Sequence, residues 1–349
     1  MDKCPNEILG LIFAEACTDD GLTGRSLSLV SRRIHNASRR YALQSVALYG
    51  SYQLSAFVRL LDKADLEDRH ICHLYLTDRR RAWMEYPPGQ DRERWLRERI
   101  AADIRRFNDS RLRHSSSAIL RILKTVAPTV QTLTLLLFDQ YDEQPLSDAV
   151  PFPKLRELTI HISNMTYAVQ SELPQCMSLR RLHVIQDFLL KRPIATAVSQ
   201  LSPLLTHLRI SRLASNPLMD VVPGLEDMLH QDDLASTGFP PTLKRVLVQM
   251  LQQRLYGHNG HGALRQMLNS PIAYQLRDVA MQDVQQRIVF LKPAIWNLAE
   301  TLTGENSDVH FYMGIKAAWE KRMVESESAF WDVEPSSILA SYGYCAEGE

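Results

Sequence analysis

The sequence predicts an α/β protein, an irregular solenoid of strand and helix units that follows a small helical module. Three observations predict this fold class. A six-residue aliphatic pattern recurs along the middle of the chain at a nearly constant interval. The segments between its copies have the apolar spacing of helices. Two short helical segments precede the first copy.

The helical module begins at the segment Cys4-Pro5-Asn6-Glu7. Proline suits the first turn of a helix because its φ is already helical, and Glu7 suits the positive end of the helix dipole. The apolar positions that follow form one predicted stripe: Ile8, Leu9, Ile12 and Phe13. After a polar break at 18–21, a second helical segment is predicted from Leu27 to Ala37.

Two phrases in this module, Pro5-Asn6-Glu7-Ile8-Leu9 and Ser28-Leu29-Val30-Ser31-Arg32-Arg33-Ile34, resemble an F-box. In that family a proline–acid–aliphatic helix precedes a Leu-Val-Ser/Cys-Arg/Lys helix. The resemblance covers residues 3–46 and implies docking on the Skp-type adaptor of a cullin ubiquitin ligase. The sequence departs from the family at Cys4, where leucine is usual, and has no tryptophan near residue 45.

The resemblance implies adaptor-binding residues in both helical segments. They are Pro5, Glu7, Ile8, Leu9, Ile12, Phe13, Leu29, Val30, Ser31 and Ile34. A module of this size is too short to bury its own apolar surface, so we expect it to complete its core with helices of the partner. The alternative is that the same residues pack against the first repeats as an N-terminal cap.

The recurring pattern consists of an aliphatic residue, two variable residues, an aliphatic, one variable and an aliphatic. The four central copies begin at Val130, Leu155, Leu179 and Leu205, at intervals of 25, 24 and 26 residues (155−130, 179−155, 205−179). This interval is typical of leucine-rich repeats, and each copy suits a strand with one buried face. Weaker copies begin at Leu43, Ile71, Leu243 and Leu276.

This region resembles the degenerate leucine-rich repeats of fungal F-box proteins, without the asparagine or cysteine ladder of the regular family. Helices are predicted at 117–123 and 194–201, and a C-terminal helix at 309–331. The predicted domains are an F-box-like module at 1–45, a repeat array at 46–290 and a helical cap with a loose tail at 291–349. Insertions are expected near 77–117, as an arginine-rich amphipathic helix, and near 212–242, as a loop with a short helix.

Strand residues between the buried aliphatic positions are expected on the concave face of the solenoid. That face would gather six basic or imidazole side chains: His161, Arg181, His183, His207, Arg209 and Arg245. Such groups suit a carboxylate- or phosphate-bearing segment, so they form the predicted substrate-binding site. The alternative is an ordinary solvated polar face.

Composition narrows the functional classes. In 349 residues, 40 Lys and Arg balance 40 Asp and Glu, so no net charge draws the chain to nucleic acid or to an anionic membrane. Five dispersed cysteines predict neither a disulfide framework nor a zinc site. The start of the chain has no basic region typical of a signal peptide, and the longest apolar run is far too short to span a membrane. We expect a protein of the cytoplasm, the nucleus or both.

No catalytic motif stands out: the sequence has no glycine-rich phosphate loop and no Gly-x-Ser-x-Gly elbow. The His258–His261 pair lies in a glycine-rich segment and is interpreted as a turn. We therefore expect no enzyme activity, no cofactor and no metal. The leading hypothesis is a substrate-recognition adaptor of a cullin-type (SCF) ubiquitin ligase that binds a protein substrate through its repeats. The alternatives are a repeat scaffold without a ligase role and an enzyme with an unfamiliar site.

Overall fold

Strands form at seven of the eight copies of the aliphatic pattern, and the described residues contain one further strand after the last copy. The strands are β1 (Ser45–Tyr49), β2 (His73–Thr77), β3 (Thr132–Leu137), β4 (Glu157–Ile162), β5 (Arg181–Ile185), β6 (His207–Leu213), β7 (Arg245–Met250) and β8 (Ile288–Leu291). The copy from Leu276 lies instead in helix α12 (Pro271–Gln282), which Ser270 caps by accepting a hydrogen bond from the Ala273 amide. The pattern misleads there because its first two positions, Leu276 and Val279, are also one helical turn apart.

The computed structural model describes part of the chain and divides it into two units. The described residues are 4–79, 111–138, 150–162, 175–185, 194–213, 221–229, 238–250, 269–291, 306–324 and 330–331. The first unit comprises residues up to Leu158 together with 308–326, and the second comprises 159–307 together with 327–349. The division falls inside β4.

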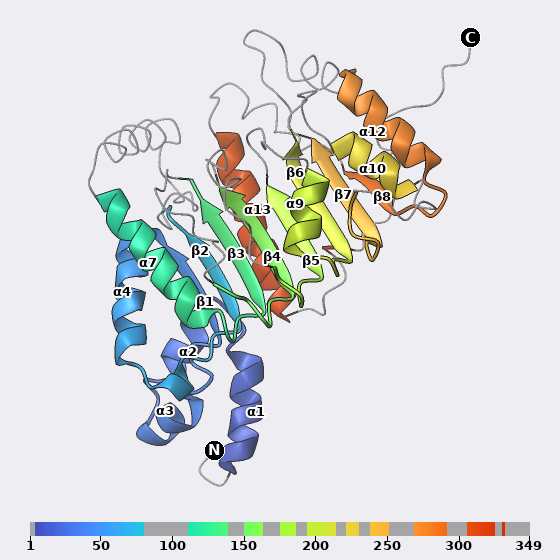
Figure 1. Cartoon of the computed structure of the whole chain (residues 1–349). Helices are drawn as coiled ribbons and strands as arrows, with labels where there is room; N and C mark the ends of the chain where they lie inside the picture. The colour runs from blue at the N-terminus through green and yellow to red at the C-terminus, as the bar shows by residue number, and fades with distance from the viewer. Residues whose placement is uncertain are drawn as a thin grey trace. The chain divides into compact units, whose positions relative to one another are not determined.

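The strands lie in the sheet in chain order, from β1 to β8, and every pair with a described register is parallel (Figure 1). Equivalent positions of the aliphatic pattern pair with one another: Leu74 of β2 pairs with Val46 of β1 and with Leu133 of β3. The register therefore stacks the aliphatic positions into continuous buried rows.

The predicted leucine-rich-repeat solenoid is wrong, because the structure is an α/β fold with an all-parallel sheet whose strands are buried on both faces. In β2, Leu74 and Leu76 are buried on one face, and Tyr75 between them is equally buried on the other. Burial on both faces is the rule for parallel sheets covered by helices, whereas a solenoid leaves its concave face open.

The prediction that the N-terminal helices form a separate F-box-like module before the repeats is also wrong. Three short helices occur there: α1 (Asn6–Ala16), α2 (Leu22–Leu27) and α3 (Arg32–Ser38). They belong to the same unit as β1, β2 and β3. The second predicted helical segment is split because Ser31 has an extended backbone and its hydroxyl accepts the Ile34 amide proton, which starts α3 anew.

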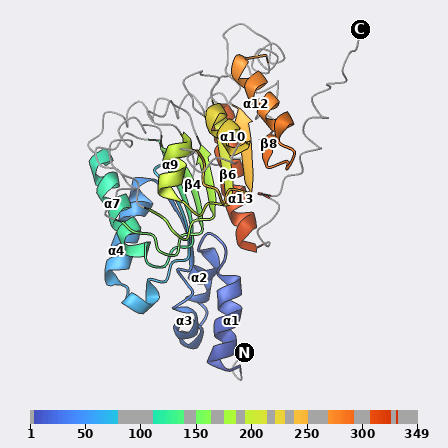
Figure 2. The same ribbon diagram turned by 45° about the vertical axis from the view of Figure 1, so that its right-hand side comes forward.

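In the first unit, helices cover both faces of the strands. Helices α4 (Gly50–Lys63) and α7 (Arg111–Val126) lie side by side on one face (Figures 1 and 2). The short 3-10 helix η1 (Leu66–Asp68) follows α4 in the chain. Helix α13 (Asn306–Val324) covers the other face, where the ring of Trp319 lies 5.7 Å from that of Tyr75. The predicted C-terminal helix at 309–331 is described over Asn306–Val324, and Phe330 and Trp331 lie in a turn.

In the second unit, α9 (Ile194–Leu201), α10 (Val221–Leu229) and α12 pack along one another and against the strands. Gly224 lets α10 approach α9 closely, because a Cβ there would lie 2.9 Å from that of Ala195. The opposite strand face is covered by Phe330 and Trp331, and Trp331 packs in a cluster with Leu247, Val289 and Leu291. Within the described residues, no helix combines the length and the apolarity needed to cross a membrane.

Candidate docking surface

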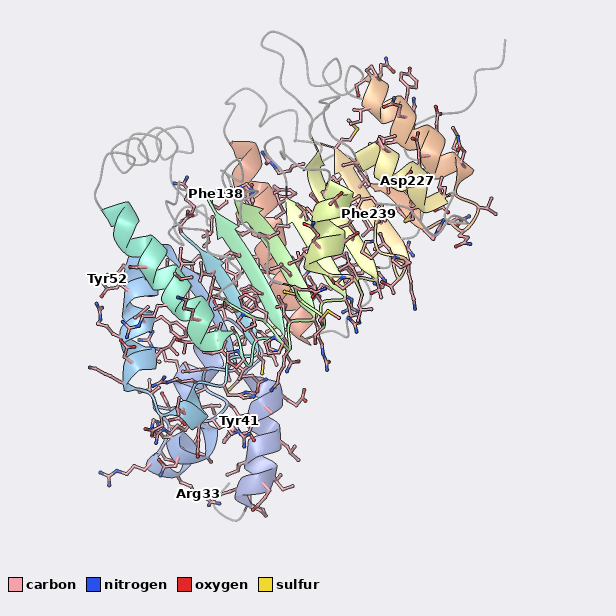
Figure 3. All side chains as sticks on the ribbon, viewed as in Figure 1. Arg33, Tyr41, Tyr52, Phe138, Asp227 and Phe239 are labelled. Atoms are coloured by element: carbon pink, nitrogen blue, oxygen red, sulfur yellow. The ribbon has the colours of Figure 1, made fainter. Side chains whose placement is uncertain are left out.

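The three N-terminal helices have a small core of their own. Leu9 and Phe13 lie one turn apart on α1 and pack with Ile34 of α3 in a buried cluster. Tyr41 packs against the same cluster beside α1 (Figure 3). Gly24 of α2 is required for this packing, since a Cβ there would lie 2.3 Å from the Ala42 carbonyl oxygen.

Polar contacts fix the connections between these helices. The Asp19 carboxylate accepts hydrogen bonds from the amides of Gly21 and Thr23, at 2.9 and 2.8 Å, and so caps the start of α2. Arg33 donates to the Cys4 carbonyl oxygen at 2.6 Å and ties α3 to the chain before α1. The helices therefore hold a defined arrangement without a partner.

Large apolar side chains are nevertheless concentrated on the outside of this segment. Of the thirteen exposed large hydrophobic side chains in the described part of the chain, six lie between residues 8 and 30. They are Ile8, Leu11, Ile12, Leu22, Leu29 and Val30, which we call the docking surface. Leu29 is 80% exposed and Val30 is 65% exposed. These residues all come from one short segment of helices, and concentrations of exposed apolar surface mark interaction sites on soluble proteins.

The predicted adaptor-binding residues divide between the core and the outside. Leu9, Phe13 and Ile34 are buried in the core of the helices. The other seven are exposed: Pro5, Glu7, Ile8, Ile12, Leu29, Val30 and Ser31. Sequence reasoning missed Leu11 and Leu22. Leu11 lies one turn after Ile8, a spacing that a wider apolar stripe would have included.

The predicted substrate-binding residues lie together on one strand face of the second unit, but that face is not open. Parallel pairing aligns Arg181, His207 and Arg245 in one row, and His183 with Arg209 in the next. His161 and His183 are 1% and 0% exposed, and the four other residues are half-buried. The expected open concave face is thus corrected, whereas the binding role of these residues stays a prediction.

Aromatic residues from the C-terminal segment cover this row of basic groups. The Arg209 guanidinium lies over the Phe330 ring, 4.2 Å from its centroid, and His183 lies 5.7 Å from the same ring. His183 Nε2 is also within 2.9 Å of the Ser211 hydroxyl. These contacts hold the imidazole in a fully buried position of the interior.

The titratable groups of the described residues show how burial suppresses ionisation. Burial lowers the pKa of His73 to about 4 and raises the pKa of Cys17 and of Cys176 to about 11. At neutral pH the imidazole is therefore uncharged and both thiols are protonated, a state in which they are poor nucleophiles. Three or more metal-ligating side chains do not gather anywhere in the described ranges, and His258–His261 lies outside them.

Comparison with known proteins adds no family. The sequence matches no protein-family model, and no curated protein is similar to it. The F-box resemblance accordingly rests on the residues of the N-terminal helices alone.

Proposed function

We propose that this chain is the substrate-recognition adaptor of a cullin-type ubiquitin ligase, and that it docks on a Skp-type adaptor through the docking surface. One observation carries the proposal: six large apolar side chains lie outside a helical segment whose own core is already filled. The F-box resemblance of the same segment supplies the identity of the partner.

The energetics favour a protein partner for this surface. Complete burial of one Leu, Ile or Val side chain contributes about 1.5–3 kcal/mol, and association costs on the order of 4–15 kcal/mol. Several well-buried anchors are therefore needed, and the docking surface offers six. Leu29, Leu11 and Val30 are the most exposed of the six, at 80%, 67% and 65%, so we expect them to be the strongest anchors.

The alternative is a protein-binding scaffold whose docking surface serves a partner outside any ubiquitin ligase. The exposed apolar residues favour a protein partner in both cases. Only the resemblance separates the two, because it names the Skp-type adaptor. A binding test with that adaptor therefore discriminates between them.

The test is co-purification of the tagged full chain from a eukaryotic lysate, probed for the Skp-type adaptor and for cullin. The test variant is Leu29→Asp with Val30→Asp. The matched control is Met281→Asp with Val284→Asp, which places the same charges at two exposed apolar positions of the second unit. We expect the adaptor and cullin to co-purify with the wild type and with the control variant, and neither to co-purify with the test variant.

Folding must be shown unchanged in both variants, by circular dichroism and by Tm. Failure of the wild type to recover the adaptor would contradict the ligase role and favour the scaffold. If the test variant recovered as much adaptor as the wild type, the claim that the docking surface binds the adaptor would be contradicted.

A further inference from the structure

A second candidate binding feature lies in the first unit where α3 and α4 meet. A pocket of about 560 Å³ opens there, lined by residues from the end of α2, from α3 and from the second half of α4. That volume is within the range of about 300–1,000 Å³ that is usual for ligand sites. None of the six residues of the docking surface lines it.

The lining residues of the pocket carry an excess of positive charge. Arg39, Arg59 and Lys63 are cations, and Asp68 is the carboxylate among the lining residues, which leaves a surplus of two (3−1). Asp68 already pairs with Arg39 Nε at 2.5 Å. Within the described part of the chain, neither Arg59 nor Lys63 has an ion-pair partner. Both are exposed and available to an anion.

Among the described residues, the neighbouring carboxylates Asp62 and Asp65 pair with other arginines rather than with these two cations. Asp65 pairs with Arg39 at 2.5 Å, and Asp62 pairs with Arg121 of α7 at 2.6 Å. Each of these acids is therefore held by another arginine. The charge of Arg59 and Lys63 is left to face solvent or a ligand.

The pocket also has an apolar side. Ala56 and Leu60 line it one turn apart on α4, and Ala64 lines it directly after the helix ends. Leu60 is 44% exposed, so its side chain is available to an apolar group of a ligand. A ligand that fits this pocket therefore combines negative charge with at least one apolar group.

The spacing of the cations suits an extended peptide. Arg59 and Lys63 are four residues apart, which is a rise of about 6 Å along a helix. Side chains at alternate positions of an extended peptide lie about 6.5–7 Å apart on one side. Two carboxylates at alternate positions of such a peptide can therefore reach one cation each.

The helix geometry also disfavours a small free anion. The pocket lies at the C-terminal half of α4, where the helix dipole is negative and the last carbonyl groups repel anions. An anion here must be held by the long side chains of Arg59 and Lys63, away from the backbone. A peptide carboxylate on its own side chain meets that requirement, whereas small phosphate ions are usually cradled by backbone amides at helix N-termini.

We propose that the α3–α4 pocket is a second protein-binding site that takes a short acidic peptide segment of a partner protein. The segment carries two carboxylates at alternate positions, for Arg59 and Lys63, and an apolar side chain for the apolar side of the pocket, which contains Leu60. This inference goes beyond the proposed function and does not depend on the partner of the docking surface.

The test is fluorescence anisotropy of the full chain with a labelled peptide, Leu-Glu-Ser-Glu-Leu, at low ionic strength. We expect saturable binding that weakens at least about tenfold in the variant Arg59→Glu with Lys63→Glu, and that weakens with added salt. The peptide Leu-Gln-Ser-Gln-Leu should bind far more weakly. The matched charge control is Lys154→Glu with Lys244→Glu, two exposed lysines outside the pocket, which should bind as the wild type does.

Leu60→Asp tests the apolar side of the pocket and should weaken binding of the acidic peptide further. The uncharged variant Leu29→Ser with Val30→Ser should bind it normally, so failure of this site is distinguishable from failure of the docking surface. Absence of saturable binding, or equal binding by the Arg59→Glu, Lys63→Glu variant, would overturn the proposal. Tighter binding of a hexathymidine oligonucleotide, lost in the same variant, would also overturn it and assign the pocket to nucleic acid.

Discussion

The N-terminal helices and the strand faces of the two units place their side chains in opposite ways. The helices expose Leu29 and Val30, whereas the strands bury imidazole and carboxylate groups such as His183 and Glu157. An exposed apolar group indicates a missing partner, and a buried polar group indicates a specific internal contact. The exposed helices are therefore the place to look for a binding partner, whereas the buried polar strand residues chiefly organise the interior.

The largest effect expected inside the strand faces is at the ion pair between Arg322 of α13 and Glu157 of β4. Arg322 Nε lies 3.0 Å from Glu157 Oε1, and both side chains are buried. Arg322→Leu would leave the carboxylate buried without its arginine, so we expect a loss of about 3–5 kcal/mol of unfolding free energy. Urea denaturation measures it.

An exposed ion pair of the same unit provides the control for that measurement. Arg121 lies 2.6 Å from Asp62, and both side chains are largely exposed to solvent. Arg121→Leu should cost about 0–1 kcal/mol. Equal losses for Arg121→Leu and Arg322→Leu would show that burial of the Glu157 pair does not matter to stability.

The second largest effect on stability is expected in the core of the N-terminal helices, compared with their exposed face. Leu9 is buried with Phe13, whereas the neighbouring Ile8 is about half exposed. Leu9→Ala should cost about 2–5 kcal/mol, because it leaves a cavity in the core of the helices. Ile8→Ala should cost well under that amount and weaken adaptor binding instead. Thermal denaturation of both variants checks the stability difference, and a larger loss for Ile8→Ala would contradict the assignment.

The third effect is a pH dependence of stability from β2. Burial lowers the pKa of His73 from its ordinary 6.5 to about 4, so the folded state resists protonation that the unfolded chain accepts. The unfolded state therefore binds more protons between pH 6.5 and 4, and the unfolding free energy falls as pH drops through that window, by up to about 3 kcal/mol. Urea denaturation at pH 7 and 4.5 measures the change.

A matched pair of variants isolates His73 in that experiment. His73→Gln should reduce the loss of stability between pH 7 and 4.5. His35→Gln, at an exposed position on α3, should leave it as in the wild type. An unchanged pH dependence in His73→Gln would refute the contribution of this imidazole.

The smallest effect on stability is expected at the docking surface itself. Replacement of Leu29 and Val30 by serine removes little buried area, so the unfolding free energy should change by less than about 0.5 kcal/mol. Adaptor binding should nevertheless fall strongly. A loss of stability as large as that of Leu9→Ala would show that these residues pack internally.

The sequence predicted the positions of most strands and the class of most helices, because both depend on local spacing. The aliphatic pattern located β1 to β7, and the segment at 194–201 coincides with α9. Leu276 was assigned wrongly because its spacing to Val279 fits a strand unit and a helical turn equally well. Local spacing cannot decide between the two without knowledge of the Ser270 cap.

The open concave face could not be judged from local sequence, because residues far along the chain cover the strands. Tyr75 is covered by Trp319, and His183 by Phe330, each more than a hundred residues away in sequence. Alternation in a strand predicts that His183 points away from the aliphatic rows, which is correct. Alternation does not predict which residues cover the strand face toward which His183 points.

The most direct test of the central claim is a calorimetric titration of the purified full chain with a purified Skp-type adaptor. We expect saturable one-to-one binding by the wild type, binding of similar strength by Met281→Asp with Val284→Asp, and none by Leu29→Asp with Val30→Asp. No heat of binding with the folded wild type, or equal binding by all three proteins, would contradict the claim that the exposed apolar side chains of the N-terminal helices dock this adaptor.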